Sequence, residues 1–199
     1  MGASDFSADE LDFLKTLNTP EKLQDYVDSI HYNYCENGYI CKSPKRVLRE
    51  NNAHCFEGSL FIASVRRING HIPFVIDMQG IENDDHVIVP FKKKGLWGAM
   101  AQSRTYTLKW RDPIYKSLRE LVLSYFPFFI KRNIPVLRTY TEPIDLTIYD
   151  YMNWETTDNC LEELGDKLTE SPHKNLFPNN LQIRQVPLEL EQILNRWKK

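Results

Sequence analysis

The sequence of 199 residues lacks the features that mark several large classes of protein. No segment approaches the roughly 18 consecutive apolar residues of a membrane-spanning helix, and the first residues show neither a basic region nor an apolar run. The formal net charge is only −2, so no excess of positive charge favours nucleic acid. We therefore expect a cytoplasmic protein with no membrane and no nucleic-acid partner.

Cysteine is scarce and irregularly spaced. The four cysteines do not form the pattern of a disulfide framework in a chain of this length: Cys35, Cys41, Cys55 and Cys160. Cys35 and Cys41, with the nearby His31 and His54, could suggest zinc, but the gap between the two cysteines is not that of a zinc knuckle. We expect reduced thiols, and we expect neither a metal nor a cofactor.

The chain does contain enough apolar material for one core. Hydrophobic residues make up 42% of the chain and aromatic residues 12%, so residues 1–199 are predicted to form a single α+β domain. Capping signals, among them those at Ser7, Thr19 and Ser43, and apolar periodicity predict helices at 8–18, 20–30, 45–50, 112–126, 159–168 and from 187 onward. Buried or alternating runs predict strands at 72–78, 86–91, 96–102, 139–141 and 146–149.

The stretch 51–65 carries the strongest chemical signal. Its apolar residues recur at helical spacing, and this predicts a helix with Asn52 as N-cap and Cys55 in the first turn. The free N–H groups at a helix start stabilise a thiolate, so we expect the pKa of the Cys55 thiol to be lowered. A thiol nucleophile also needs a base, and His86, at the start of a predicted strand, is the candidate.

The residue that would orient the base depends on the hairpin that follows His86. A two-residue turn at Lys94-Gly95 would place His86 opposite Ser103, whereas a three-residue loop would place it opposite Gln102. Either side chain could hold the imidazole in the tautomer whose other nitrogen takes the thiol proton. The backbone N–H of Cys55 is the expected donor to the oxyanion.

Several runs of the sequence resemble one known family. They are Asn52-Ala53-His54-Cys55-Phe56-Glu57-Gly58, an apolar helix ending at Asn69-Gly70-His71, the run Asp84-Asp85-His86-Val87, and a hairpin through Trp97. Together they resemble the transglutaminase-like superfamily, and in particular its small stand-alone bacterial and archaeal members. The resemblance covers about residues 19–125. It implies a papain-like α+β core in which a nucleophile helix packs on a small antiparallel sheet.

This resemblance also implies roles for the residues. Cys55 and His86 match the family nucleophile and base. In the commoner family pattern an aspartate follows the tryptophan by four positions, but this chain has Ala101 there, which leaves the orienting role to Gln102 or Ser103. Beyond the core at 19–125, we expect additional N-terminal and C-terminal helices, with residues 126–199 packed on the core as an extension.

Three functions are compatible with these observations. The leading hypothesis is a cysteine-dependent amide hydrolase, peptidase or acyl transferase that acts through a thioester on Cys55, with a peptide, a protein or a small amide as substrate. The alternative is a catalytically degenerate member that serves as a binding or scaffold module, because the family aspartate is missing. A thiol sensor is a third hypothesis, and it requires a second cysteine near Cys55.

Other residues near these motifs have both a functional and a structural interpretation. Tyr32, Tyr34 and Tyr39 could floor a substrate groove or merely pack. Asp77 could form a hydrogen bond near the site or meet water at a strand end. Glu57 stabilises the first turn of a helix with or without a catalytic duty.

Overall fold

A computed structural model describes residues 6–34, 41–81, 84–189 and 192–193 of the chain. The fold is mixed α+β and is built on a seven-stranded sheet in the order β11-β9-β3-β4-β5-β6, with β10 also paired to β3. All pairs in this sheet are antiparallel. The strands are β3 (Phe74–Gly80), β4 (Asp85–Lys93), β5 (Leu96–Met100), β6 (Arg111–Tyr115), β9 (Leu137–Thr141), β10 (Ile144–Asp145) and β11 (His173–Asn175).

The helices are α1 (Ala8–Thr16), α2 (Pro20–Ser29), α3 (Pro44–Glu50), α4 (Cys55–Ile68), α5 (Leu118–Leu123) and α6 (Glu162–Thr169). Short 3-10 turns are η1 (Tyr106–Leu108), η2 (Phe126–Phe128) and η3 (Leu146–Met152). Two short pairs complete the described elements: β1 (His31–Tyr32) with β2 (Asn52–Ala53), and β7 (Ile130–Lys131) with β8 (Ile134–Pro135). Hydroxyl caps predicted from the sequence begin three of the helices, since Ser7, Thr19 and Ser43 each accept a backbone N–H three residues on.

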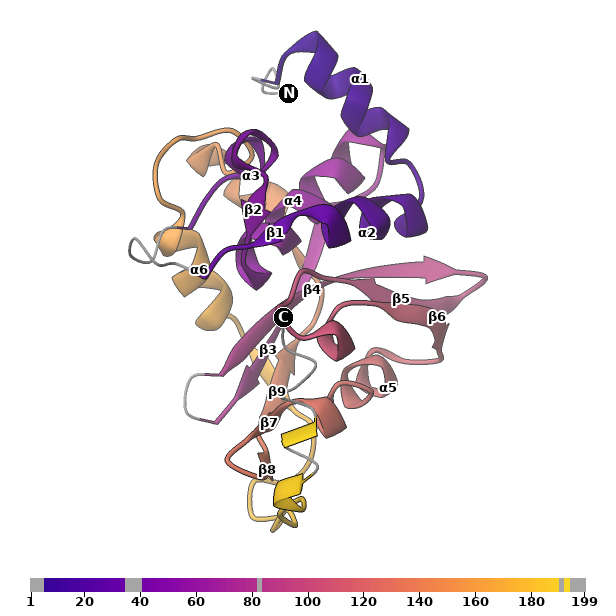
Figure 1. Ribbon diagram of the computed structural model, residues 1–199, viewed down its shortest axis with the longest axis vertical. Helices are drawn as coiled ribbons and strands as arrows, with labels where there is room; N and C mark the ends of the chain where they lie inside the picture. The colour runs from indigo at the N-terminus through magenta and orange to yellow at the C-terminus, as the bar shows by residue number, and fades with distance from the viewer. Residues whose placement is uncertain (1–5, 35–40, 82–83, 190–191, 194–199) are drawn as a thin grey trace.

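The central strands are buried on both faces. On one face Val75, Val87 and Val89 pack with α4, and on the other Ile76, Met78 and Ile88 pack with residues of α5. This alternation follows from the two-residue period of a strand. Figure 1 shows the sheet with α1, α2 and α4 on one side of its β4–β5–β6 part and α5 on the other.

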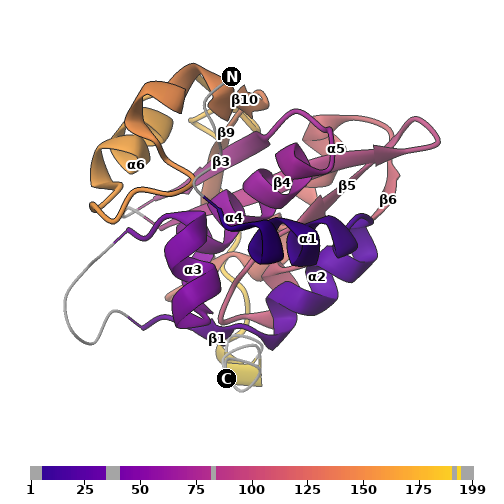
Figure 2. The same ribbon diagram turned by 90° about the horizontal axis from the view of Figure 1, so that it is seen from above.

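The last third of the chain is part of the same core. It supplies β9, β10 and β11 to the sheet, so β9 lies between β3 and β11 rather than at an edge. Trp154, Leu161 and Leu164 are buried in the cluster that contains α4. Figure 2 shows α6 beside the helices that surround α4. The described residues after 126 therefore complete the sheet in addition to covering it.

The sheet opens along β4, and this opening positions the site. Residues 85–88 of β4 pair with β3, whereas residues 89–93 pair with β5, and the β4–β5 ladder stops at Val89 opposite Met100. The turn at Lys94-Gly95 has both residues at positive φ, as a two-residue hairpin turn requires. Beyond Met100 the chain leaves the ladder, so the β5 side of β4 is open at His86 and Val87.

Two sequence expectations differ from the structure. Residues 111–115 form β6 at the sheet edge, and α5 begins only at Leu118 with Ser117 as cap, so the helix predicted from Asp112 was wrong. Pro113 is tolerated because it lies in an irregular part of an edge strand, where the register with β5 shifts between Trp97 and Ala99. Residues 146–152 form the turn η3 instead of a strand, and most of the helix predicted from Pro187 lies outside the described residues.

Candidate active site

Cys55 is the first residue of α4, as the first-turn prediction required, but the N-cap is His54 and not Asn52. Asn52 instead pairs with His31 between β2 and β1. The buried carboxylate of Glu57 explains this start, because it accepts the backbone N–H groups of His54 and Lys42, each at 2.9 Å. Glu57 therefore has a structural role, which is to bind the chain before α4 to the first turn of the helix.

The start of α4 lies against the open edge of β4. The Ser59 hydroxyl, one turn after Cys55, donates a hydrogen bond to the Val87 carbonyl at 2.6 Å. The side chain of Cys55 is half-buried, and the nearby backbone N–H groups of Phe56 and Val87 face its sulfur. The opening between β4 and β5 therefore brings the thiol next to the backbone of His86 and Val87.

The pKa of the Cys55 thiol is raised, so the expectation of a lowered value was wrong. It rises from 9.0 to about 11, mainly because of burial and in smaller part because of the charge of Asp77, while the N–H groups of Phe56, Val87 and Cys55 act in the opposite direction. Desolvation exceeds the stabilisation from the helix start because a thiolate loses its water shell there. The resting site therefore holds a neutral thiol.

His86 is held in one tautomer. Its Nε2 lies 2.9 Å from the carbonyl oxygen of Leu108, and a carbonyl can only accept, so Nε2 carries the proton. The ring packs near Tyr125 and Phe129, with centroid separations of 6.2 and 6.5 Å. Burial lowers the pKa of His86 to about 4, so the ring is neutral at physiological pH. Nδ1 is then an acceptor, and it has no hydrogen-bond partner among the described residues.

Cys55 and His86 line the same cavity, which has a volume of about 310 Å³. Tyr32, Ser103 and Arg104 also line it. The structure thus places the two predicted residues, one from α4 and one from β4, on the wall of one cavity. Within the described part of the chain, no hydrogen bond joins the thiol to the imidazole.

Neither residue predicted to orient His86 does so. The side-chain amide of Gln102 donates to the carbonyls of Val27 and Ile30 at 3.0 and 3.2 Å, and its oxygen accepts the Ser103 N–H. The Ser103 hydroxyl accepts a backbone N–H two residues on, at 3.1 Å. The two-residue turn was correct, but the ladder ends before it reaches His86. The Leu108 carbonyl takes the orienting position instead.

A second group of polar residues lies on the other side of the thiol. Cys55, Asp77 and Asp85 line a cavity of about 290 Å³ together with residues of α6. Nε2 of His173 lies 3.1 Å from the Asp77 carboxylate, and its Nδ1 lies 2.6 Å from the Ser171 carbonyl. Both partners are acceptors, so His173 is held as an imidazolium and cannot also take a proton from the thiol.

The sequence indicated one member of the Asp77–His173 pair and not the other. Asp77 stands out as an acid in an apolar strand, but His173 lies in the last third, where no motif marks it. Burial by itself would lower the pKa of His173, but its bonds to Asp77 and the Ser171 carbonyl raise it above the ordinary value. Asp77 lies in β3 and His173 in β11, and β9 lies between these two strands. The pair therefore forms only when β9 joins the sheet.

The other cysteines differ in how deeply they are buried. Cys41 is buried and lines the same cavity as Cys55 and Asp77, while Cys160 is exposed and its sulfur accepts the Cys41 N–H at 3.3 Å. Cys35 and Tyr39 lie outside the described residues. Among the residues that the structure does describe, no three His, Cys, Asp or Glu side chains form a group that could hold a metal.

None of the described helices has both the length and the apolar character needed to cross a bilayer.

No family model matches the chain, and no curated protein matches it.

Proposed function

We propose that the protein is a cysteine-dependent amide hydrolase or acyl transferase with a papain-like, transglutaminase-like arrangement of nucleophile helix and sheet. The observation that carries the proposal is the bond from His86 Nε2 to the Leu108 carbonyl. This bond leaves Nδ1 as the basic nitrogen of an imidazole that shares a cavity with the Cys55 thiol. In this proposal Cys55 is the nucleophile, His86 is the base and the Leu108 carbonyl is the orienting group.

The chemistry proceeds in two halves. The Cys55 sulfur attacks the carbonyl carbon of the substrate while its proton passes to His86 Nδ1, and the carbonyl oxygen becomes an oxyanion. The N–H of Cys55, at the first position of α4, is the expected donor to this oxyanion. The imidazolium then gives its proton to the leaving amine as the C–N bond breaks. Water or a second amine attacks the resulting thioester with His86 again as base.

The resting charges define the kind of catalysis. The pKa of Cys55 is raised to about 11 by burial and that of His86 is lowered to about 4, also mainly by burial. A stable thiolate–imidazolium pair does not form between such groups. The proton therefore leaves sulfur only as the carbonyl carbon is attacked, and the Leu108 carbonyl stabilises the imidazolium through its bond to Nε2.

The direct test is acylation of Cys55 by p-nitrophenyl acetate, an activated ester that needs no specific pocket. The Cys160→Ala background removes the exposed thiol, and mass spectrometry of the Cys55 peptide measures the acetyl thioester. Cys55→Ala should remove the label, and His86→Gln should slow acylation by about 10² to 10⁴, the usual contribution of a general base. His71→Gln, an exposed histidine after α4, is the matched control and should leave the rate unchanged.

A folded His86→Gln variant that acylates Cys55 at the wild-type rate would refute the role of His86 as base. Circular dichroism and thermal unfolding of each variant establish that it is folded.

A catalytically degenerate binding module is the second candidate. It is favoured by the absence of a hydrogen bond between the described side chains of Cys55 and His86, and by the raised pKa of the thiol. This candidate predicts no thioester on Cys55 with any activated ester, in the wild type as in His86→Gln. The same mass measurement therefore separates the two functions.

A further inference from the structure

A larger cavity adjoins the one that Cys55 and His86 line. Its volume is about 750 Å³, and it lies between the end of α2, the β1 segment and the residues that follow β5. Tyr32, Ser103 and Arg104 line both cavities, so the two meet at these three residues. A molecule bound in the larger cavity therefore contacts residues that also line the cavity of the thiol.

The charged side chains that line this cavity are not all neutralised by an ion pair. Lys109 Nζ lies 3.0 Å from the carboxylate of Asp28, so these two charges neutralise each other. Arg104 is exposed, and its guanidinium forms no ion pair or hydrogen bond with any residue that the structure describes. The cavity thus has one unneutralised positive charge, at its junction with the cavity of Cys55.

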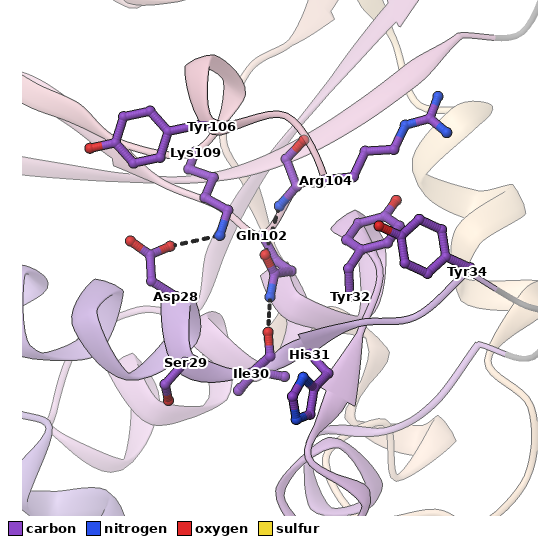
Figure 3. Close-up of a pocket in the computed structure, with 11 residues that line it drawn as sticks. Asp28, Ser29, Ile30, His31, Tyr32, Tyr34, Gln102, Arg104, Tyr106 and Lys109 are labelled. Atoms are coloured by element: carbon purple, nitrogen blue, oxygen red, sulfur yellow. Dashed lines mark hydrogen bonds and ion pairs between the residues drawn. The ribbon is translucent and has the colours of Figure 1, made fainter. Parts of the chain in front are cut away.

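Three tyrosine rings line this cavity together with Arg104. The rings of Tyr32 and Tyr34 contact each other edge to face at 5.0 Å, and Tyr34 is 53% exposed. Tyr106 is 70% exposed and lines the same cavity. Figure 3 shows Arg104, Tyr32 and Tyr34 on one side of the cavity and the Asp28–Lys109 pair on the other.

We propose that this cavity binds a substrate that carries a carboxylate, and that Arg104 is the residue that selects it. A planar guanidinium binds a carboxylate through two parallel hydrogen bonds, and the tyrosine rings offer apolar area for an aromatic or aliphatic group beside it. The substrate class is therefore an acidic amide or short peptide. That the bound molecule is a substrate rests on the proposed function, whereas binding of its carboxylate at Arg104 does not.

The first experiment compares two alkylating agents that differ only by a carboxylate. Iodoacetate and iodoacetamide attack the same thiolate, form the same S–C bond and release iodide, so the ratio of their rates at Cys55 is independent of the thiol pKa. The rates are read from the Cys55 peptide by mass spectrometry, with the exposed Cys160 in the same sample as reference.

Arg104→Gln should lower the ratio of iodoacetate to iodoacetamide at Cys55 by about fivefold, the factor that one opposite charge at about 4 Å gives in bulk water. Lys94→Gln removes the same charge from the tip of the β4–β5 turn and should leave the ratio unchanged. Equal ratios in the wild type and Arg104→Gln would overturn the assignment of Arg104.

The second experiment measures binding without chemistry. In Cys55→Ala, N-acetylphenylalanine should bind at least about fivefold more tightly than N-acetylphenylalaninamide by calorimetry, and Arg104→Gln should abolish the difference. If this difference appears while Cys55 forms no thioester, the carboxylate site is supported and the enzymatic function fails. If the two compounds bind equally to Cys55→Ala, the carboxylate site fails whether or not Cys55 is acylated.

Discussion

The reactivity of Cys55 toward iodoacetamide should be low at neutral pH and should keep rising well above it. Only the thiolate reacts, and burial raises the pKa of Cys55 from 9.0 to about 11. This change makes the thiolate fraction about 100-fold smaller at neutral pH, since each tenfold step corresponds to one pH unit. A thiolate of higher pKa is also more nucleophilic, by about sixfold to tenfold for this difference.

The two effects combine to a rate about tenfold to twentyfold below that of an ordinary thiol near pH 8. The assay follows alkylation of the Cys55 and Cys160 peptides in one sample by mass spectrometry, from about pH 7 to pH 10.5. Cys160 is the internal reference because its side chain is exposed. The Cys55 rate should still be climbing at the upper limit.

Asp77→Asn adds a second, independent measurement. The Asp77 charge is one of the causes that raise the pKa of Cys55, so its removal should shift the alkylation profile to lower pH. An inflection for wild-type Cys55 below about pH 8.5 would refute the account, because stabilisation by the N–H groups at the start of α4 would then exceed the desolvation of the thiolate.

Two further predictions concern stability. Gly58→Ala should destabilise the fold by about 1 to 3 kcal/mol in urea unfolding, because the added Cβ would lie 2.3 Å from Gln102 Cβ. Its matched control, Gly165→Ala, meets its nearest atom at 3.8 Å and should stabilise α6 by up to about 1 kcal/mol. In urea unfolding as a function of pH, His86 and His173 should act in opposite directions. Burial lowers the pKa of His86 to about 4, so about 3 kcal/mol should be lost as pH falls from 6.5 toward 4. The raised pKa of His173 should make stability fall as pH rises above 6.5 through its folded value. His86→Gln should remove only the loss of stability at low pH, and His173→Gln only the loss of stability at high pH. An unchanged pH profile of stability in either variant would contradict the role assigned to that histidine.

Local signals in the sequence predicted much of the scaffold. The capping residues Ser7, Thr19 and Ser43 begin helices where expected, and Cys55 lies in the first turn of α4. The two-residue turn at Lys94-Gly95 was one of the two turns that the sequence allowed, and Gly95 suits the positive φ that it adopts there. Each of these features depends on a few neighbouring residues.

Long-range features were not predictable in this way. Residues 111–115 contain the same Asp-Pro signal that begins helices, and only pairing with β5 at the sheet edge makes them a strand. The helix and strand preferences of a short segment are small compared with the free energy of burial in a sheet. The pairing of His173 with Asp77 likewise requires strand β9 between them.

The sequence by itself determined which side chains could do chemistry, a cysteine at a helix start and a histidine in a strand, because residue types and short spacings are local properties. Only the tertiary structure decided their surroundings. The Leu108 carbonyl that holds His86 has no sequence signal, since every residue has a carbonyl. The raised pKa of Cys55 depends on the burial of its sulfur and on the charge of Asp77 from β3, which together exceed the effect of the N–H groups of Phe56 in α4 and Val87 in β4.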